Sequence, residues 1–146
     1  MAVLVSRYNE VVTARLLDGA RECFRDKGVP EGRVDVIWVP GAFELPVAAE
    51  AAAASGRYAA LVALGCVVRG ETPHFEYLAA EATRGLGHVA LAHQLPVAFG
   101  VLTTDTLEQA LARAGGAAGN KGYEAADAAL TTADVLGQLT RAAPRD

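Results

Sequence analysis

The sequence has little cysteine and no excess of basic residues. Cys23 and Cys66 are its only cysteines among 146 residues. Their wide separation argues against a zinc site and against a disulfide framework, so we expect a reduced, cytoplasmic protein. Lysine and arginine number 13 against 17 aspartate and glutamate residues, which gives a formal net charge of −4. Proteins that bind nucleic acid usually carry a basic excess, so no nucleic-acid partner is expected.

Long apolar runs are also missing. The N-terminal apolar run, residues 2–5, is far too short for the apolar region of a signal peptide. No stretch approaches the ~18 apolar residues that cross a bilayer, so no membrane partner is expected. The composition, 52% hydrophobic and 21% charged, is typical of a globular protein. We expect residues 1–146 to form one domain.

Strand-like and helix-like segments alternate along the chain. The predicted strands are the apolar or β-branched runs at 2–5, 34–39, 58–68 and 96–103. The predicted helices cover about 11–27, the alanine-rich stretch that ends near 55, 73–93, 106–114 and 120–141. Regular alternation predicts parallel strands joined by crossover helices. The expected fold is therefore α/β, a three-layer α/β/α sandwich with a four-stranded parallel sheet.

The segments that follow the predicted strands are candidates for a binding site. In parallel sheets of this kind the ligand lies beyond the carboxyl ends of the strands. The segments at those ends are "SRYN" (6–9), "PGAFE" (40–44), "RGETPH" (69–74) and "TTD" (103–105). Because the strands are predicted to be parallel, these segments should meet at one edge of the sheet.

The third of these segments has the composition of an anion-binding turn. Gly70 lets the backbone approach a ligand closely, Thr72 is a predicted helix cap, and Pro73 suits the first position of a helix. Free N–H groups at a helix start can bind an anion. A capped turn without any ligand explains this stretch equally well.

Histidine is a candidate for proton transfer at one of three positions. His74 falls in the first turn of the helix predicted after this segment, beside the possible anion site. A lone histidine is more often a surface or packing residue. His88 and His93 lie toward the far end of the same predicted helix and are interpreted as structural.

Aromatic residues and a carboxylate follow the first two predicted strands. Tyr8 and Phe43 offer flat faces for a planar ring, and Glu44 can accept hydrogen bonds from ring N–H groups or hydroxyls. The alternative is a loop tyrosine and a helix start in which Phe43 packs and Glu44 complements the helix dipole. Their coincidence at one edge favours a binding pocket.

A glycine-rich stretch, residues 112–122, separates the last two predicted helices. Its spacing matches neither a P-loop nor a dinucleotide-binding motif. Arg113 has the guanidinium that binds phosphate in a bidentate manner, although a solvated arginine at a helix end is the commoner case. Lys121 adds a second positive charge.

Taken together, "VSRYNE", "VPGAFELP", "GCVVRGETPHFEY", "FGVLTTDTLEQA" and "RAGGAAGNKG" resemble the 6,7-dimethyl-8-ribityllumazine synthase family. The resemblance covers about residues 3–140. It implies a flavodoxin-like fold and the penultimate step of riboflavin biosynthesis. In that step 5-amino-6-(D-ribitylamino)uracil condenses with 3,4-dihydroxy-2-butanone 4-phosphate, releasing phosphate and water, without a metal or organic cofactor.

The resemblance also assigns roles to residues. His74 matches the proton-transferring residue. The residues that match the ribitylaminouracil site are Tyr8, Ala42, Phe43, Glu44, Cys66, Val67, Val68, Phe99 and Lys121. The residues that match the phosphate site are Glu71, Thr72 and Arg113. In the family Phe99, Arg113 and Lys121 come from the neighbouring subunit of a homopentamer, which some members assemble into decamers or icosahedral shells.

Some positions depart from the commonest family pattern. Tyr8 stands in place of phenylalanine, Cys66 in place of threonine, and Ala117 where a lysine is frequent. Little sequence precedes the first predicted strand, so we expect the pentamer more firmly than a shell. Arg69 matches no substrate ligand and is interpreted as a structural tie for its loop.

Three alternative functions stay open at this stage. An archaeal-type riboflavin synthase shares the architecture and would convert the lumazine alone. A flavin or lumazine carrier, or a shell protein, would bind lumazine without turning over the two substrates, although His74 and Arg113 argue against it. A flavodoxin-like electron carrier would bind flavin through a hydroxyl-rich loop, which "SRYNE" matches poorly.

Overall fold

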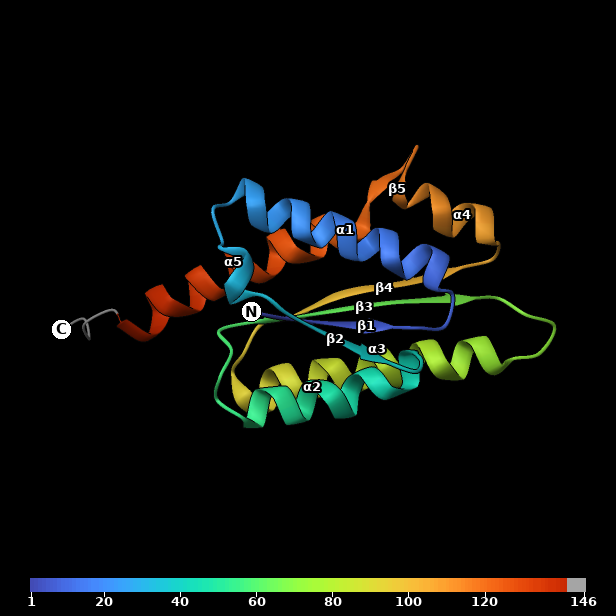
Figure 1. Cartoon of the computed structure of the whole chain (residues 1–146). Coiled ribbons are helices and arrows are strands. Elements are labelled where there is room, and N and C mark those ends of the chain that lie inside the picture. The colour runs from blue at the N-terminus through green and yellow to red at the C-terminus, as the bar shows by residue number, and fades with distance from the viewer. Residues whose placement is uncertain (142–146) are drawn as a thin grey trace.

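A parallel four-stranded sheet forms the centre of the protein (Figure 1). The structure is a computed structural model, and it describes residues 1–141. The strands are β1 (Ala2–Ser6), β2 (Asp35–Val39), β3 (Leu61–Val68) and β4 (Val97–Thr104). They are arranged in the order β2-β1-β3-β4, and every neighbouring pair is parallel.

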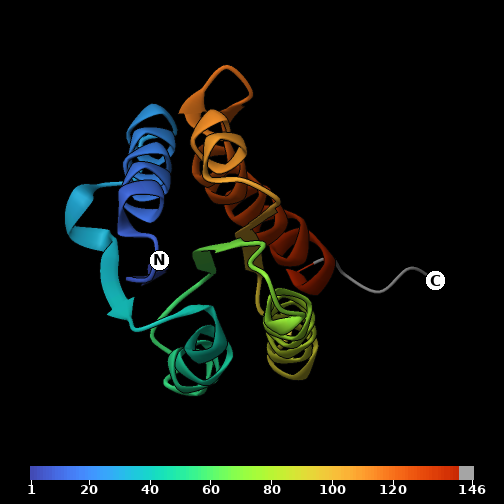
Figure 2. The same ribbon diagram turned by 90° about the vertical axis from the view of Figure 1, so that its right-hand side faces the viewer.

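Helices cover both faces of this sheet. They are α1 (Glu10–Asp26), α2 (Leu45–Ala54), α3 (His74–His93), α4 (Leu107–Ala112) and α5 (Lys121–Arg141). Figure 1 shows α1, α4 and α5 on one face and α2 and α3 on the other, and Figure 2 shows the same two layers from the end where the strands finish. The predicted α/β/α sandwich with a flavodoxin-like fold is confirmed. Within residues 1–141, no helix combines the length and the apolar character that a membrane span requires.

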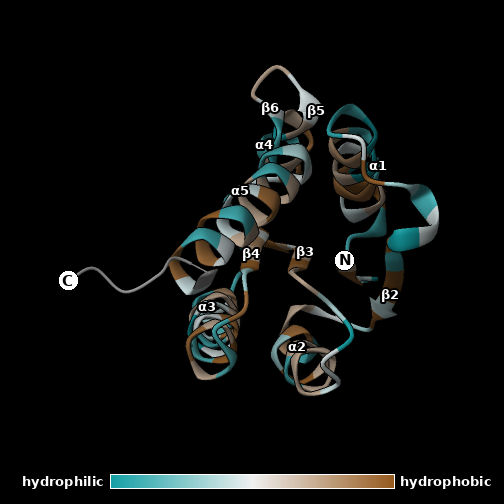
Figure 3. Cartoon of the chain, turned by 90° about the vertical axis from the view of Figure 1, so that its left-hand side faces the viewer, coloured by the Kyte–Doolittle hydropathy of each residue, from teal (hydrophilic) through white to brown (hydrophobic). Residues whose placement is uncertain are grey.

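The central strands β1 and β3 are buried on both faces because their side chains point alternately toward the two helix layers. On β1, Val3 and Val5 pack with α1 and α5, whereas Leu4 packs with α2 and α3. β3 and β4 are brown in Figure 3, between helices that alternate between brown and teal along their length. This pattern is typical of strands inside a parallel sheet and of amphipathic helices that cover it.

The predicted element boundaries differ from the observed ones by a few residues. The predicted strand at 58–68 begins only at Leu61, and the predicted helix at 106–114 is shorter, Leu107–Ala112. The glycine-rich stretch is not a plain break: it forms an antiparallel hairpin of β5 (Ala114–Gly116) and β6 (Gly119–Asn120). Gly119 has a φ of 83°, a left-handed conformation that favours glycine.

The chain order of the strands explains where a ligand can bind. From β1 the chain moves to β2 on one side, and the next strand, β3, lies on the other side of β1. The helices that follow β1 and β3, α1 and α3, therefore lie on opposite faces of the sheet (Figure 1). Such a reversal opens a crevice between the loops at the carboxyl ends of these two strands.

Candidate active site

A cavity of about 800 Å³ lies beyond the carboxyl ends of the strands. The predicted site residues that line it are Tyr8, Ala42, Phe43, Glu44, Cys66, Val67, Val68, Thr72 and His74. The other lining residues are Gly41, Gly70, Phe75, Tyr77, Leu78 and Glu81. Segments that are far apart in the chain therefore share one concave surface large enough for a small molecule.

Two aromatic side chains leave open faces in the wall of this cavity. Tyr8 is 73% exposed and Phe43 is 59% exposed, although both are large hydrophobic residues. The Tyr8 N–H donates to the Pro40 carbonyl at 3.0 Å, which joins the loop after β1 to the loop after β2. Phe43 lies in a short 3₁₀ turn, η2 (Ala42–Glu44). Open aromatic faces of this kind are suited to stacking on a planar ring.

Glu44 adds a half-buried carboxylate beside these rings. Its N–H donates to the Gly41 carbonyl at 3.2 Å, which closes the 3₁₀ turn. No residue within 1–141 donates a hydrogen bond to its carboxylate. The carboxylate is therefore available to accept hydrogen bonds from a ligand.

Asn9 was missed by the sequence analysis, and it fixes the loop after β1. Its Nδ2 donates to the Cys66 carbonyl at 3.0 Å, and its own carbonyl accepts the N–H groups of Val12 and Thr13. Asn9 has a φ of 60°, in the left-handed region that asparagine tolerates better than most residues. An asparagine between a predicted strand and a predicted helix is the sequence signal that could have indicated this turn.

Cys66 lines the cavity at the end of β3, but its thiol is buried. The side chain packs in the core under α1 and α5 and is 2% exposed. Burial raises the pKa of the Cys66 thiol to about 11. The thiol is therefore neutral near pH 7 and is a poor nucleophile.

The loop between β3 and α3 presents unpaired N–H groups. The N–H groups of Gly70, Glu71 and Thr72 donate to no other residue within 1–141. The predicted cap was wrong: α3 begins at His74, no side chain caps it, and Thr72 lies one residue too early to do so. Glu71 belongs to this loop but does not line the cavity. Uncapped N–H groups near a helix start leave room for an anion.

His74 stands at the junction of this loop and the cavity. It is exposed, it lines the cavity, and its ring has no hydrogen-bond partner within the described part of the chain. The other two histidines lie outside the cavity: His93 contacts Glu50 of α2 at 2.8 Å, and His88 is exposed. His74 is thus the histidine placed to exchange protons with a bound molecule.

Comparison with protein families bears on what such a molecule would be. A family model described as 6,7-dimethyl-8-ribityllumazine synthase matches residues 1–137. The chain belongs to this family. The resemblance drawn from the sequence motifs is thereby confirmed, and it places the protein among transferases that make lumazine in riboflavin biosynthesis. The match includes every segment that lines the cavity.

Besides Glu71, three other residues that match the lumazine synthase site do not line the cavity. Phe99 lies on the edge strand β4 and is 40% exposed. Arg113 follows α4 and donates from Nη1 to the Gln109 carbonyl at 2.9 Å. Lys121 starts α5, with its Nζ 3.9 Å from Glu124 Oε1. Within one chain, therefore, the structure does not bring these residues together with His74.

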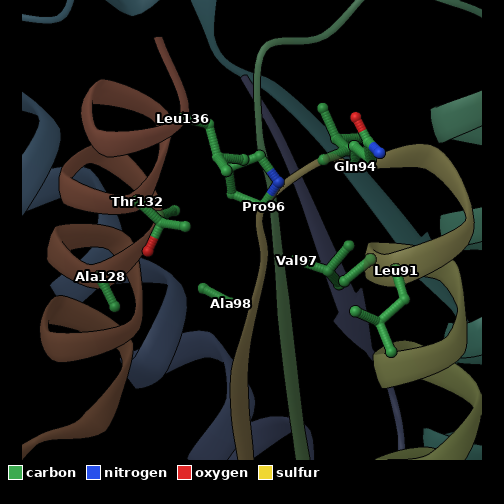
Figure 4. Close-up of a pocket in the computed structure, with 11 residues that line it drawn as sticks. Leu91, Gln94, Pro96, Val97, Ala98, Ala128, Thr132 and Leu136 are labelled. Atoms are coloured by element: carbon green, nitrogen blue, oxygen red, sulfur yellow. The ribbon is translucent and has the colours of Figure 1, made fainter. Parts of the chain in front are cut away.

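A second hollow of about 560 Å³ lies at the opposite end of the sheet (Figure 4). Residues from the end of α3, the start of β4 and α5 line it, and Figure 4 labels Leu91, Pro96 and Thr132 among them. None of its lining residues is ionisable. It holds none of the residues that match the lumazine synthase site. Among residues 1–141, no three histidine, cysteine, aspartate or glutamate side chains are grouped to hold a metal ion.

Proposed function

We propose that the protein condenses 5-amino-6-(D-ribitylamino)uracil with 3,4-dihydroxy-2-butanone 4-phosphate to 6,7-dimethyl-8-ribityllumazine, releasing phosphate and water. The observation that carries this proposal is the content of the cavity. The cavity wall and the loop beside it present four kinds of group: open aromatic faces, a free carboxylate, unpaired N–H groups and a free histidine. These groups match a planar ring, its polar substituents, a phosphate and a proton transfer, respectively.

The ring side of the cavity would bind the ribitylaminouracil. Tyr8 would stack on the pyrimidine, and Glu44 would accept hydrogen bonds from the ribityl chain or the ring. Ala42 and Phe43 would form the wall beside the ribityl chain. Residues 66–68 would contribute mainly backbone groups, because the Cys66 side chain is turned into the core.

The loop side would bind the butanone phosphate. The unpaired N–H groups of Glu71 and Thr72 can donate to phosphate oxygens, and the positive end of α3 adds to the attraction. The Glu71 side chain lies outside the cavity, so the contribution of Glu71 would come from its backbone. Arg113 of a neighbouring subunit would supply the positive side chain.

His74 would move the protons that the condensation requires. The 5-amino group attacks the ketone, and loss of water gives an imine. Loss of a proton from C3 and of phosphate from C4 then gives an enol, which tautomerises to a new ketone at C3. The ribityl-bearing nitrogen closes the second ring on this ketone with loss of a further water. A histidine near the phosphate can serve several of these steps, a contribution of about 10²–10⁴-fold. Holding two reactants in register contributes up to about 7–11 kcal/mol more, so neither a metal nor an organic cofactor is required.

The active form would be a homopentamer with a site between each pair of neighbours. Phe99, Arg113 and Lys121 lie outside the cavity of their own chain, as expected if they serve the next subunit. Phe99 is an exposed aromatic on an edge strand, where a partner would cover it. We expect residues 1–146 to act as one lumazine synthase domain in the cytoplasm.

The direct test is to mix the purified protein with both substrates and follow the absorbance of the lumazine. Product should appear only when both substrates are present. Conversion of the lumazine alone would instead indicate a riboflavin synthase. Binding of lumazine without any turnover of the two substrates would indicate a carrier.

A further inference from the structure

Arg69 connects the start of the loop between β3 and α3 to two other parts of the protein. Its N–H donates to the Thr104 carbonyl at 2.8 Å, and its Nε donates to Asp105 Oδ1, also at 2.8 Å. Its Nη1 lies 3.7 Å from Glu76 Oε1 in α3. Its guanidinium lies over the Phe75 ring, 4.8 Å from the ring centroid. The side chain therefore links the turn after β4 to the first turn of α3.

The turn that holds Asp105 is itself well fixed. Thr106 and Gln109 form a capping box at the start of α4, in which the Gln109 N–H donates to Thr106 Oγ1 at 3.1 Å. The Asp105 N–H donates to Gln109 Oε1 at 2.9 Å, and Thr104 Oγ1 donates to the Thr106 carbonyl at 2.8 Å. A turn with paired backbone groups of this kind holds the Asp105 carboxylate in one place.

The loop that follows Arg69 has few other ties. The N–H groups of Gly70, Glu71 and Thr72 donate to no residue within 1–141, and each of these residues is exposed. The next backbone bond along the chain is Glu76 N–H to the Pro73 carbonyl, inside the start of α3. The position of the loop relative to the sheet therefore depends on the contacts that Arg69 makes.

We propose that Arg69, held by Asp105, is a positioning residue that sets the loop N–H groups and His74 against the ring side of the cavity. The inference rests on the proposed function, because it takes the loop to be the phosphate site. Arg69 itself is not available as a phosphate ligand. Its guanidinium already faces two carboxylates and one aromatic ring. In agreement, the hydrogen bond to Asp105 raises the pKa of Arg69.

The substitution Asp105→Asn distinguishes positioning from direct binding. If Arg69 bound phosphate, removing the Asp105 charge would free its guanidinium and tighten phosphate binding. If Arg69 positions the loop, the same substitution releases the loop and lowers kcat/KM for the butanone phosphate. The two roles thus predict changes of opposite sign.

The test is a double-mutant cycle with Arg69→Gln, Asp105→Asn and the double variant. Steady-state kinetics with each substrate varied give kcat and both KM values. Each single substitution should lower kcat/KM for the butanone phosphate by about threefold to tenfold, the change that the net contribution of one hydrogen bond produces. The double variant should lose no more than the worse single variant, because both changes break the same contact. The KM for ribitylaminouracil should stay within about twofold, since the ring side is built by other loops.

Arg57 offers a matched control at the other end of the sheet. It pairs with Asp35 at 3.4 Å and lies over Tyr58 at 5.2 Å, so it makes the same kinds of contact away from the cavity. Arg57→Gln should leave all kinetic constants unchanged.

Several outcomes would overturn the inference. One such outcome is that the losses of the two single variants add up in the double variant. Another is that Asp105→Asn lowers the KM for the butanone phosphate. A third is that the wild type is active and the variants have the same kinetic constants as the wild type. A fourth is a loss accompanied by a lower urea midpoint or an altered oligomer, which would indicate a general structural role. A wild type that makes no lumazine would show instead that the proposed function itself is wrong, and the inference would fall with it.

Discussion

At the scale of single residues, the proposed function makes His74 the group that transfers protons. We predict that His74→Ala lowers kcat by about 10²–10⁴-fold, the usual contribution of a positioned acid–base group, without abolishing turnover. Activity remains because the two substrates are still held in register. Initial rates of lumazine formation at saturating substrates measure this effect.

His88 provides the control for this prediction. It lies on the same helix, α3, is exposed, and does not line the cavity. His88→Ala should therefore keep the wild-type kcat. Complete loss of turnover in His74→Ala, with both substrates still bound, would show that holding the substrates in register is not the main source of catalysis.

The sequence identified cavity residues best where they follow a strand directly. Phe43 and His74 were found because a parallel sheet brings the loops after its strands together. The Arg69–Asp105 pair and the bond from Asn9 to Cys66 were not found. Each joins residues that are distant in the chain, and their pairing depends on side-chain geometry that no local pattern encodes.

At the scale of elements, the approach of α3 to α2 depends on Gly85. A Cβ at Gly85 would lie 2.7 Å from Pro46 Cβ and Cγ, whereas a Cβ at Gly87, on the same helix, would meet nothing within 4 Å. We predict that Gly85→Ala destabilises the protein by about 1–3 kcal/mol through overpacking. Gly87→Ala should stabilise it by about 0.5–1 kcal/mol, because alanine is the better helix former. Urea denaturation at one protein concentration compares the two, and equal effects would contradict the predicted contact.

A hydrogen bond between α1 and α5 gives the stability an alkaline pH dependence. The Tyr123 hydroxyl donates to Asp26 Oδ2 at 2.8 Å, and this bond raises the pKa of Tyr123 from 10.0 to about 12. Because the folded pKa is the higher one, the stabilisation is fully present below pH 10 and is lost as the pH rises toward about 12.

The substitution Tyr123→Phe isolates this effect. The difference in unfolding free energy between wild type and Tyr123→Phe should be constant below pH 10 and should shrink between pH 10 and about 12. A difference that stays constant over the whole range would show that the hydroxyl does not donate to Asp26.

The sequence predicted the type of the main elements but not all of their limits. Continuous apolar runs predicted β3 and β4, because a strand that is covered on both faces shows no alternation of apolar and polar residues. The hairpin of β5 and β6 was missed, because its glycines and alanines resemble a loop. The predicted start of α3, about residue 73, lies within one residue of the observed start at His74, but the predicted cap by Thr72 is absent because Pro73 occupies the capping position.

At the scale of the whole molecule, we propose that the site is shared between neighbouring subunits. We predict that His74→Ala and Arg113→Ala complement each other in mixed oligomers made by coexpression and purified through two tags. In a head-to-tail ring, about one quarter of the sites would take an intact loop from one subunit and an intact Arg113 from the next. The mixed oligomer should then regain about one quarter of the wild-type rate.

A mixture of His74→Ala with Phe43→Ala is the matched control. Both residues line the cavity of the same chain, so no mixed site contains both intact groups. This mixture should stay as slow as the single variants. Equal recovery in the two mixtures, or none in the first, would contradict a site that is shared between neighbours.

One measurement tests the central claim most directly: lumazine and inorganic phosphate determined in the same sample while the purified protein turns over both substrates. The two products should appear in a ratio of one to one, only with both substrates present, and much more slowly with His74→Ala. No lumazine above the uncatalysed background, or lumazine formed at the same rate by His74→Ala, would contradict the assignment of this cavity as the site of lumazine synthesis.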